Sequence, residues 1–130
     1  MTGAGRSRPV EFEARNRLAS AGYFTLRFSG SRKPVNLVGL DEREVILVKV
    51  KRSRKPVQGI SEVHDEYRQD ALQLRKIGGP RSCRKELWIF SAAGGWKFYE
   101  VFPGGIMETE RECPIHSKCN PMGLDLQYKP

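Results

Sequence analysis

Lysines and arginines cluster in one short stretch of the sequence, where their chemistry would be the binding of phosphate. Five of them lie close together: Lys49, Lys51, Arg52, Arg54 and Lys55. Ammonium and guanidinium groups bind phosphate oxygens without reading base sequence, and the resulting affinity falls steeply with salt. The sequence therefore predicts a phosphate-binding face. The alternative is the end of a strand whose lysines contact only solvent.

The positive charge of the whole chain lies in its first half. The formal net charge is +8, and residues 1–58 hold 13 lysines and arginines against 5 aspartates and glutamates. Residues 59–130 hold 10 of each kind and are neutral. Such segregation is typical of a surface that faces phosphates. We therefore expect further phosphate contacts from the other basic residues of the first half: Arg6, Arg8, Arg27, Arg32 and Lys33.

Three cysteines and one histidine are candidate zinc ligands. Cys113, His116 and Cys119 have the spacing C-x₂-H-x₂-C, and Cys83 is the candidate for a fourth ligand. Structural zinc is normally held by four thiolate or imidazole ligands. The alternative is three free cysteines, because a small odd number argues against a disulfide scaffold. Apart from this zinc, the residues suggest no cofactor.

A flexible arm and an amphipathic helix are predicted at the start of the chain. Residues 1–9 are polar and basic, and we expect them to form the arm. Pro9 can open a helix, and Glu11 would then lie in the first turn, where the helix dipole favours a carboxylate. Apolar residues follow at helical spacing up to a glycine that would end the helix: Val10, Ala14, Leu18, Ala21 and Gly22.

Three strands separated by polar turns are predicted next, at residues 23–29, 35–40 and 44–51. In the last of them, Lys49 and Lys51 alternate with Val48 and Val50. The lysines would therefore share one face of the strand and the valines the other. A basic loop, residues 52–59, would continue this strand.

The second half of the chain predicts one long helix and a hairpin. Apolar residues at helical spacing indicate the helix over residues 60–77. Strands at 86–91 and 97–102 would form the hairpin. Residues 104–130 have little periodicity and would be an extended tail beyond a domain of residues 10–103. Helices alternating with strands in this way predict an α/β domain, a mixed sheet flanked by helices.

Membrane insertion and secretion are not expected. The apolar stretches, such as residues 45–48, are too short to cross a bilayer. The first nine residues lack the apolar segment of a secretory signal. We expect a cytoplasmic protein with no membrane partner.

Four stretches, taken in their order and spacing, resemble the archaeal Holliday junction resolvases, a family of the PD-(D/E)XK nuclease superfamily. They are an E-x-E helix with a glycine-aromatic strand entry, an arginine-to-serine turn, two catalytic strands and a last hairpin: Glu11–Glu13 with Gly22–Phe24, Arg27–Ser31, Val35–Val38 with Val48–Lys51, and Gly95–Val101. The resemblance covers roughly residues 8–103. It implies a restriction-endonuclease-like fold with the order αβββαββ.

The resemblance also implies which residues would form a catalytic site. In the family an aspartate and a glutamate hold Mg²⁺, and a lysine two residues after the glutamate assists the attacking water. The matched positions here are Asn36 and Lys49, and only the lysine, Lys51, is retained. At ~4 Å and an effective dielectric of ~20, each repulsive charge pair costs about 4 kcal/mol. We therefore expect no Mg²⁺ and no catalysis at these positions.

Two further positions match functional residues of the family. Glu11 matches a helix carboxylate that assists metal binding, and Ser31 matches a serine near the scissile phosphate. Without a partner carboxylate, Glu11 is expected to favour its helix N-terminus. Ser31 is expected to donate to a phosphate oxygen or to serve only as a turn residue.

Carboxylates elsewhere in the sequence are the basis of an alternative. They flank the turn between the second and third strands or open the second long helix: Asp41, Glu42, Glu44, Glu62, Asp65 and Glu66. If some of them replaced the missing ligands, the protein would be an active, Mg²⁺-dependent, structure-selective endonuclease. Helix capping and solvation explain the same residues without a metal.

Aromatic residues of the last hairpin are candidates for base stacking or for the core. Trp88 and Trp96 lie there with Phe90, Phe98 and Tyr99. Aromatic rings stack on bases, but in strands they more often form core or dimer contacts, which we favour. The resemblance implies a homodimer, and this region could serve it.

The sequence as a whole predicts a catalytically inactive, resolvase-like protein that binds nucleic acid through its basic face. Its role would be a structural or accessory subunit of a nucleoprotein complex, with RNA, as in a ribosome, or branched DNA as partner. The active endonuclease is the first alternative. The second is a protein-interaction scaffold that uses the Cys/His tail.

Overall fold

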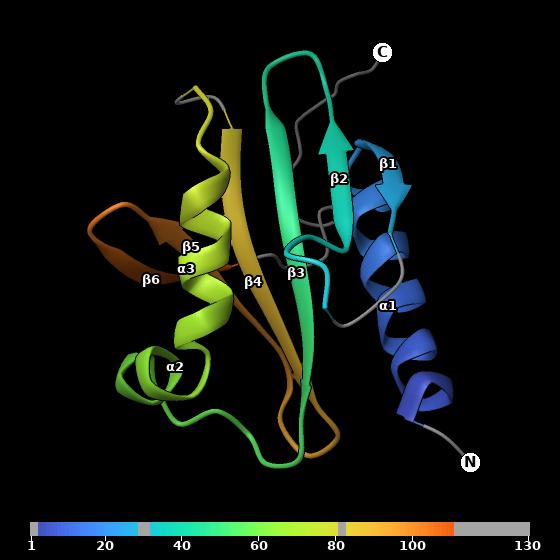
Figure 1. The fold of residues 1–130 in the computed structure, drawn as a ribbon. Helices are drawn as coiled ribbons and strands as arrows, with labels where there is room; N and C mark the ends of the chain where they lie inside the picture. Colours follow the sequence, from blue (N-terminus) through green and yellow to red (C-terminus); the bar gives the residue numbers. More distant parts are fainter. Residues whose placement is uncertain (1–2, 29–31, 81–82, 111–130) are drawn as a thin grey trace.

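The computed structural model describes residues 3–28, 32–80 and 83–110. These residues form one six-stranded mixed sheet in which the strands lie in chain order, from β1 to β6 (Figure 1). Three helices pack against it. The α/β class and the mixed sheet flanked by helices, expected from the sequence, are confirmed.

The elements have the following bounds, in chain order: α1 (Gly3–Ser20), β1 (Phe24–Arg27), β2 (Leu37–Leu40), β3 (Val45–Ser53), α2 (Ile60–Glu66), α3 (Arg68–Ile77), β4 (Cys83–Ser91), β5 (Gly95–Phe102) and β6 (Gly105–Thr109). Strands β1, β2 and β3 form an antiparallel meander. The segment with α2 and α3 then crosses to β4, which pairs in parallel with β3. Strands β4, β5 and β6 form a second antiparallel meander.

The helices cover opposite faces of the sheet and different halves of it (Figure 1). One core packs α1 against residues such as Val48 and Trp88, and the other packs α2 and α3 against residues such as Leu87 and Ile89. Leu87 and Trp88 are neighbours in one strand, so their side chains point to opposite faces. The apolar period expected for the first helix is confirmed, because Val10, Ala14 and Leu18 are all buried.

The first helix packs unusually close to the sheet at a glycine. A Cβ atom at Gly39 would lie 2.8 Å from Ile46 Cγ2 and 3.0 Å from Leu18 Cδ2. Gly39 in β2 therefore allows α1 to approach β2 and β3 closely. This contact holds α1 in place beside the ends of the first three strands.

The long second helix and the chain ends differ from the sequence expectation. The first helix, α1, begins at Gly3, so the expectation of a flexible arm over residues 1–9 is wrong from residue 3 onward. The helix expected over 60–77 is broken at Tyr67, whose backbone angles are φ −117° and ψ 30°. Tyr67 is nevertheless buried with the apolar period that predicted the helix.

The domain also extends beyond the predicted boundary at residue 103. Strand β6 pairs with β5 in register from Phe102↔Gly105 to Phe98↔Thr109. Its short length and the two glycines at its start, Gly104 just before it and Gly105 within it, gave no recognisable strand pattern in the sequence. The expectation of an extended tail is therefore wrong for residues 105–109, and residues 111–130 lie outside the described structure.

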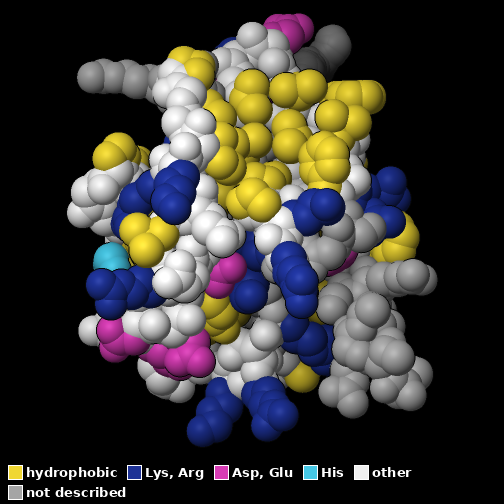
Figure 2. Space-filling model, viewed as in Figure 1, with side chains coloured by type: hydrophobic (Ala, Val, Ile, Leu, Met, Phe, Trp, Pro, Cys, Tyr) yellow, Lys and Arg dark blue, Asp and Glu magenta, His cyan; other side chains and the backbone are white. Residues whose placement is uncertain are grey.

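The face of the sheet opposite α1 carries an exposed apolar surface over β1 and β2. Phe24 is 65% exposed, Leu26 42% and Leu40 37%. Figure 2 shows hydrophobic side chains gathered where β1, β2 and β3 lie in Figure 1, with lysines and arginines next to them on the same face. No helix of the described residues is long and apolar enough to cross a membrane.

Candidate nucleic-acid interface

Three strand ends meet at one end of the sheet, which we call the basic end. Strand β1 ends there at Arg27, β2 begins at Leu37 and β3 ends at Ser53. The antiparallel pairing places Leu37 beside Arg27 and beside Val48, and β3 continues past this point to Ser53. Helix α1 lies alongside them (Figure 1). The basic residues that are distant in the sequence therefore gather at this end.

Asn36, which occupies the aspartate position of the resemblance, joins three strands. It is fully buried, its Oδ1 accepts a hydrogen bond from the Val50 amide at 2.9 Å, and its Nδ2 donates to the Phe28 carbonyl at 3.3 Å. Its own amide and carbonyl bond to Val48 and Phe28 as well. The side chain thus needs both a donor and an acceptor, and an amide supplies both.

Lys49, which occupies the glutamate position, is also buried, with only 1% of its surface exposed. Its ammonium donates to the Lys33 carbonyl at 2.6 Å. Burial lowers the pKa of Lys49, and the neighbouring charge of Lys51 lowers it further, whereas the carboxylates of Asp70 and Glu11 act in the opposite direction. The expectation that Lys49 belongs to an open phosphate-binding face is contradicted by this burial. The contact with Lys33 ties the side chain to the β1–β2 connection.

Lys51 lies on the same face of β3 as Lys49, as the alternation predicted, and Val48 and Val50 lie in the core beneath α1. Its ammonium is 3.7 Å from Asp70 Oδ2, and both side chains are partly exposed. Asp70 is in the first turn of α3. Sequence reasoning did not single out Asp70, because its contact with β3 is made only through the crossover of α3 over the sheet.

Glu11 was expected in the first turn of its helix, but it does not lie there. Because α1 begins at Gly3, Glu11 lies in the middle of the helix, and it is 7% exposed. Its carboxylate is 3.3 Å from the guanidinium of Arg27 at the end of β1. Glu11 therefore ties α1 to β1 at the basic end.

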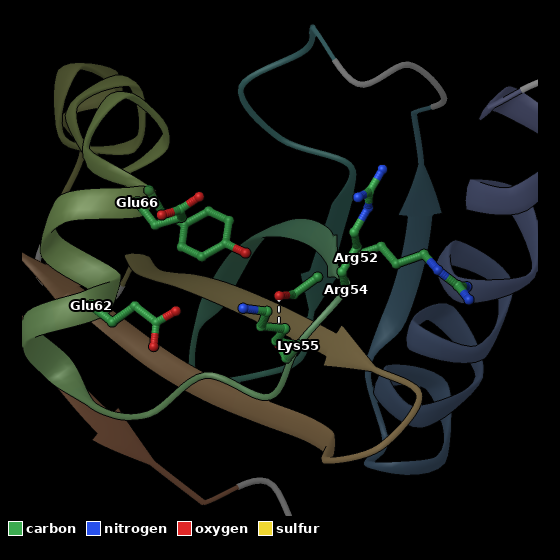
Figure 3. A pocket seen from close by; sticks show the side chains of 7 residues that line it. Arg52, Arg54, Lys55, Glu62 and Glu66 are labelled. Carbon is green, nitrogen blue, oxygen red and sulfur yellow. Dashed lines mark hydrogen bonds between the residues drawn. The ribbon is translucent and has the colours of Figure 1, made fainter.

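Arg52, Arg54 and Lys55, which we call the basic segment, are exposed. They line an open cavity of about 370 Å³, with Ser53, Tyr67, Glu62 and Glu66. Figure 3 shows the two glutamates on α2 across the cavity from Lys55, whereas the guanidinium groups of Arg52 and Arg54 extend away from them. Burial raises the pKa of Tyr67, which lines the same cavity.

The cavity is held in shape by short polar contacts. Ser53 Oγ donates to the Lys55 carbonyl at 2.6 Å, and Glu62 accepts from the Gln58 amide at 2.7 Å. Arg52 also lies over the ring of Phe90, with its Cζ 5.8 Å from the ring centroid. The basic segment is therefore exposed to solvent and is carried by an ordered turn.

The other predicted phosphate contacts lie in several places. Arg32 and Lys33 are exposed in the β1–β2 connection at the basic end. Arg6 and Arg8 are in α1, in a stretch whose side chains are outside the described structure. Ser31 is outside the described residues as well.

The candidate zinc ligands are mostly outside the described structure. Cys113, His116 and Cys119 lie beyond residue 110, and Cys83 is a half-buried free cysteine at the start of β4. Zinc binding by these four residues stays a prediction.

Three of the six candidate relocated carboxylates lie away from the basic end. Asp41, Glu42 and Glu44 flank the β2–β3 turn, at the other end of the sheet. Asp41 accepts from the amides of Arg43 and Glu44, and Glu44 accepts from the Tyr23 hydroxyl. Within the residues that the structure describes, no three His, Cys, Asp or Glu side chains group in a way that could hold a metal ion.

The hairpin aromatics are mainly core residues. Trp88, Phe98 and Tyr99 are buried, and Phe90 and Trp96 pack partly buried against them. Trp88 makes edge contacts with Phe98 at 5.0 Å and with Trp96 at 6.1 Å between ring centroids. The preference for a core role over base stacking therefore agrees with their positions.

A buried acidic group on β4 was missed by sequence reasoning. Glu86 is fully buried, accepts from Trp88 Nε1 at 2.8 Å, and pairs with Arg84 at 2.8 Å. Arg84 also pairs with Glu100 of β5 at 3.1 Å. The available signal was the i, i+2, i+4 spacing of Arg84, Glu86 and Trp88, which places all three on one face of a strand.

Comparisons with known proteins agree with this architecture. No protein-family model matches the chain, and no curated protein sequence matches it. Among solved structures, the chain is similar to Hjc, a Holliday junction resolvase of the archaeal hyperthermophile Archaeoglobus fulgidus, with a TM-score of 0.56 and 16% sequence identity. The match covers 85% of this chain and 88% of that chain. At this identity the likeness concerns the fold alone, and the mixed sheet with its helices has the resolvase fold.

Proposed function

We propose that this protein binds nucleic acid through its basic end and lacks the metal-dependent nuclease activity of the fold it shares with Hjc. It would act as a structural or accessory subunit of a nucleoprotein complex. The observation that carries the proposal is the state of Asn36 and Lys49. Both are buried and both use their polar atoms in hydrogen bonds with the protein itself.

The loss of catalysis is supported by charge and by space. A metal that stabilises phosphoryl transfer needs carboxylate oxygens and an open coordination sphere. At the matched positions the chain offers an amide that is hydrogen-bonded on both sides and a buried ammonium. An ammonium repels a divalent cation, and the nearby Lys51 adds to that repulsion.

The binding function is supported by the exposed charge at the basic end. The basic segment, Arg32 and Lys33 are exposed there, on parts of the chain that the strand ends hold together. Phosphate contacts of this kind supply affinity for many sequences alike. Either RNA or branched DNA meets the same chemistry, and the choice between them is part of the test.

The test is equilibrium binding of the full chain to a four-way DNA junction and to a structured RNA over a series of salt concentrations. The variant R54A/K55A removes two charges from the basic end, and its matched control R43A/K76A removes two exposed charges elsewhere. Arg43 lies in the β2–β3 turn and Lys76 in the last turn of α3, at the other end of the sheet. We expect R54A/K55A to weaken binding and to lower the salt slope by about two, one for each lost contact.

The control variant is expected to bind almost as the unchanged protein does. Equal losses in both variants would mean that net charge rather than the basic end determines binding, and no loss in either would remove the basic segment from the interface. Whichever ligand keeps the larger affinity at high salt identifies the preferred nucleic acid.

An active, metal-dependent endonuclease is the first alternative. The carboxylates of Asp70 and Glu11 both act to raise the pKa of Lys49, so two carboxylates lie near the matched positions. Incubation of the junction with Mg²⁺ or Mn²⁺ tests this alternative directly, and we expect no cleavage. Cleavage that is lost in Glu11→Gln would establish the endonuclease and overturn the inactive assignment.

A protein-interaction role is the second alternative. The observation that favours it is the apolar surface of Phe24, Leu26 and Leu40, because exposed apolar clusters mark contact sites between proteins. The same surface would suit a homodimer. A full chain that binds neither nucleic acid but sediments above its monomer mass would favour this alternative over ours.

A further inference from the structure

An exposed aromatic ring on α1 is in contact with two arginines beside the basic end. Phe12 is 40% exposed and belongs to neither of the two hydrophobic cores that the described residues form. The Cζ atom of Arg27 is 4.5 Å from the centroid of the Phe12 ring, and that of Arg15 is 5.6 Å from it. Both distances are within the range of cation–π contacts.

The arginine closer to the ring is held in position by two further elements. Its guanidinium pairs with the buried Glu11 at 3.3 Å, and the next residue, Phe28, bonds to the Asn36 carbonyl through its amide at 2.7 Å. Phe12 and Arg27 therefore belong to a helix and a strand whose relative position is fixed. A ring held in this way is ordered before any ligand binds, which reduces the entropy lost on binding.

We propose that Phe12, with Arg15 and Arg27, is a stacking platform for an unpaired base of the bound nucleic acid. The inference rests on the proposed function and deepens it by naming the part of the ligand that is recognised. Aromatic rings and guanidinium groups stack on any base, and the adjacent positive charge suits the backbone that carries the base. A base inside a continuous duplex has both faces covered by its neighbours. The platform therefore favours nucleic acids with unpaired nucleotides over uninterrupted duplex.

The experiment compares two ligands that share one duplex. One is blunt, and the other carries a single-stranded extension with a fluorescent base analogue, 2-aminopurine, whose emission is quenched by stacking. The unchanged full chain is expected to bind the extended ligand more tightly and to quench the analogue. F12L keeps an apolar side chain but removes the ring, and we expect it to lose the quenching and to weaken binding of the extended ligand by roughly fivefold or more. Its affinity for the blunt ligand is expected to stay unchanged.

Two variants serve as controls. F12Y keeps a ring and is expected to retain both the quenching and the affinity. F24L changes another exposed phenylalanine, at the start of β1 and away from the basic end, and is expected to bind as the unchanged protein does. Thermal melting of each variant checks that the fold is retained, which the exposure of both side chains favours.

Each outcome separates the platform from the proposed function. In the first case, the unchanged protein binds both ligands while F12L either keeps the same affinities or loses affinity equally for both. The platform is then wrong and the nucleic-acid function stands. If the unchanged protein binds neither ligand at low salt, both are wrong. A loss in F24L equal to that in F12L would show that binding does not depend on Phe12 in particular, and would also overturn the platform.

Discussion

Two groups of residues at the basic end differ in what they bind. Asn36 and Lys49 are buried, and their polar atoms are occupied by the Phe28 and Lys33 carbonyls and the Val50 amide. The basic segment is exposed and faces an open cavity. We call the first group the closed site. Lys49 of the first group and Arg52 of the second lie on the same strand, so a few residues separate a side chain that bonds within the protein from one that faces solvent.

The difference between the groups bears on the proposal that this resolvase-like fold lacks metal-dependent chemistry. Carboxylates that hold a metal must stay partly unsatisfied by the protein, and such a cluster costs stability without the metal. At the same positions, the amide of Asn36 and the ammonium of Lys49 form hydrogen bonds with backbone groups of the protein instead. The comparison therefore predicts that changes in the closed site alter stability, whereas changes in the basic segment alter binding.

The largest effect on stability is expected for Asn36→Ala. The change removes the partners of the Val50 amide and the Phe28 carbonyl, and a buried group without a partner costs about 1–3 kcal/mol. We expect a loss of about 3 kcal/mol in the free energy of unfolding, measured by urea denaturation. Asn36→Asp keeps the acceptor for Val50 but places a carboxylate against the Phe28 carbonyl, and it should also be less stable than the unchanged protein.

Asn16→Ala is the matched control, because Asn16 is an exposed residue of α1 and its change should leave stability as it is. The variant R54A/K55A should likewise unfold at the same urea concentration as the unchanged protein. If Asn36→Ala were as stable as these controls, the closed site would not be a structural element, and the comparison between the two groups would fail.

Lys49→Met is expected to have a smaller effect, of opposite sign. Burial lowers the pKa of Lys49, which means that the fold disfavours its charged form. Burying a charged group costs free energy, and an apolar side chain of similar size avoids that cost. We expect Lys49→Met to be at least as stable as the unchanged protein at neutral pH.

The pH dependence of this effect follows from the direction of the shift. Because the pKa of Lys49 in the folded protein is below the unfolded value of 10.5, the unfolded chain binds more protons between the two values. The unchanged protein therefore gains stability as the pH rises toward 10.5, and the advantage of Lys49→Met shrinks over the same range. Unfolding measured at several pH values checks this. A variant that is less stable at neutral pH would show that the ammonium itself stabilises the closed site.

Local patterns in the sequence were sufficient for the two faces of β3 and for the buried side of α2 and α3. The alternation of Lys49 and Lys51 with Val48 and Val50 gave the correct faces of β3, because a strand repeats every two residues. The spacing of Val63, Tyr67, Ala71 and Leu74 gave the correct buried side of α2 and α3. These features depend only on neighbours along the chain.

Contacts between distant segments could not be obtained in that way. The burial of Lys49 depends on the Lys33 carbonyl, and the place of Lys51 depends on Asp70 in α3. Strand β6 is recognisable only through its pairing with β5. The contact of Phe12 with Arg27 likewise requires α1 to lie beside β1. In each case tertiary packing, rather than local propensity, decides the outcome.

The smallest expected effect concerns the acidic side of the cavity, and it sharpens the description of the basic segment. Glu62 and Glu66 face Lys55 across the cavity and reduce its attraction for phosphate (Figure 3). E62Q/E66Q removes both charges, and the glutamine at 62 keeps an oxygen that can accept from the Gln58 amide. Charges exposed to solvent interact by roughly 0.2–1 kcal/mol, so we expect a gain in affinity of about twofold to fivefold, greatest at low salt. The control E42Q/E110Q removes two exposed charges that do not line the cavity. An equal gain in the control would show that only net charge matters. No gain in E62Q/E66Q would mean that bound phosphate lies on the side of Arg52 and Arg54, away from the glutamates.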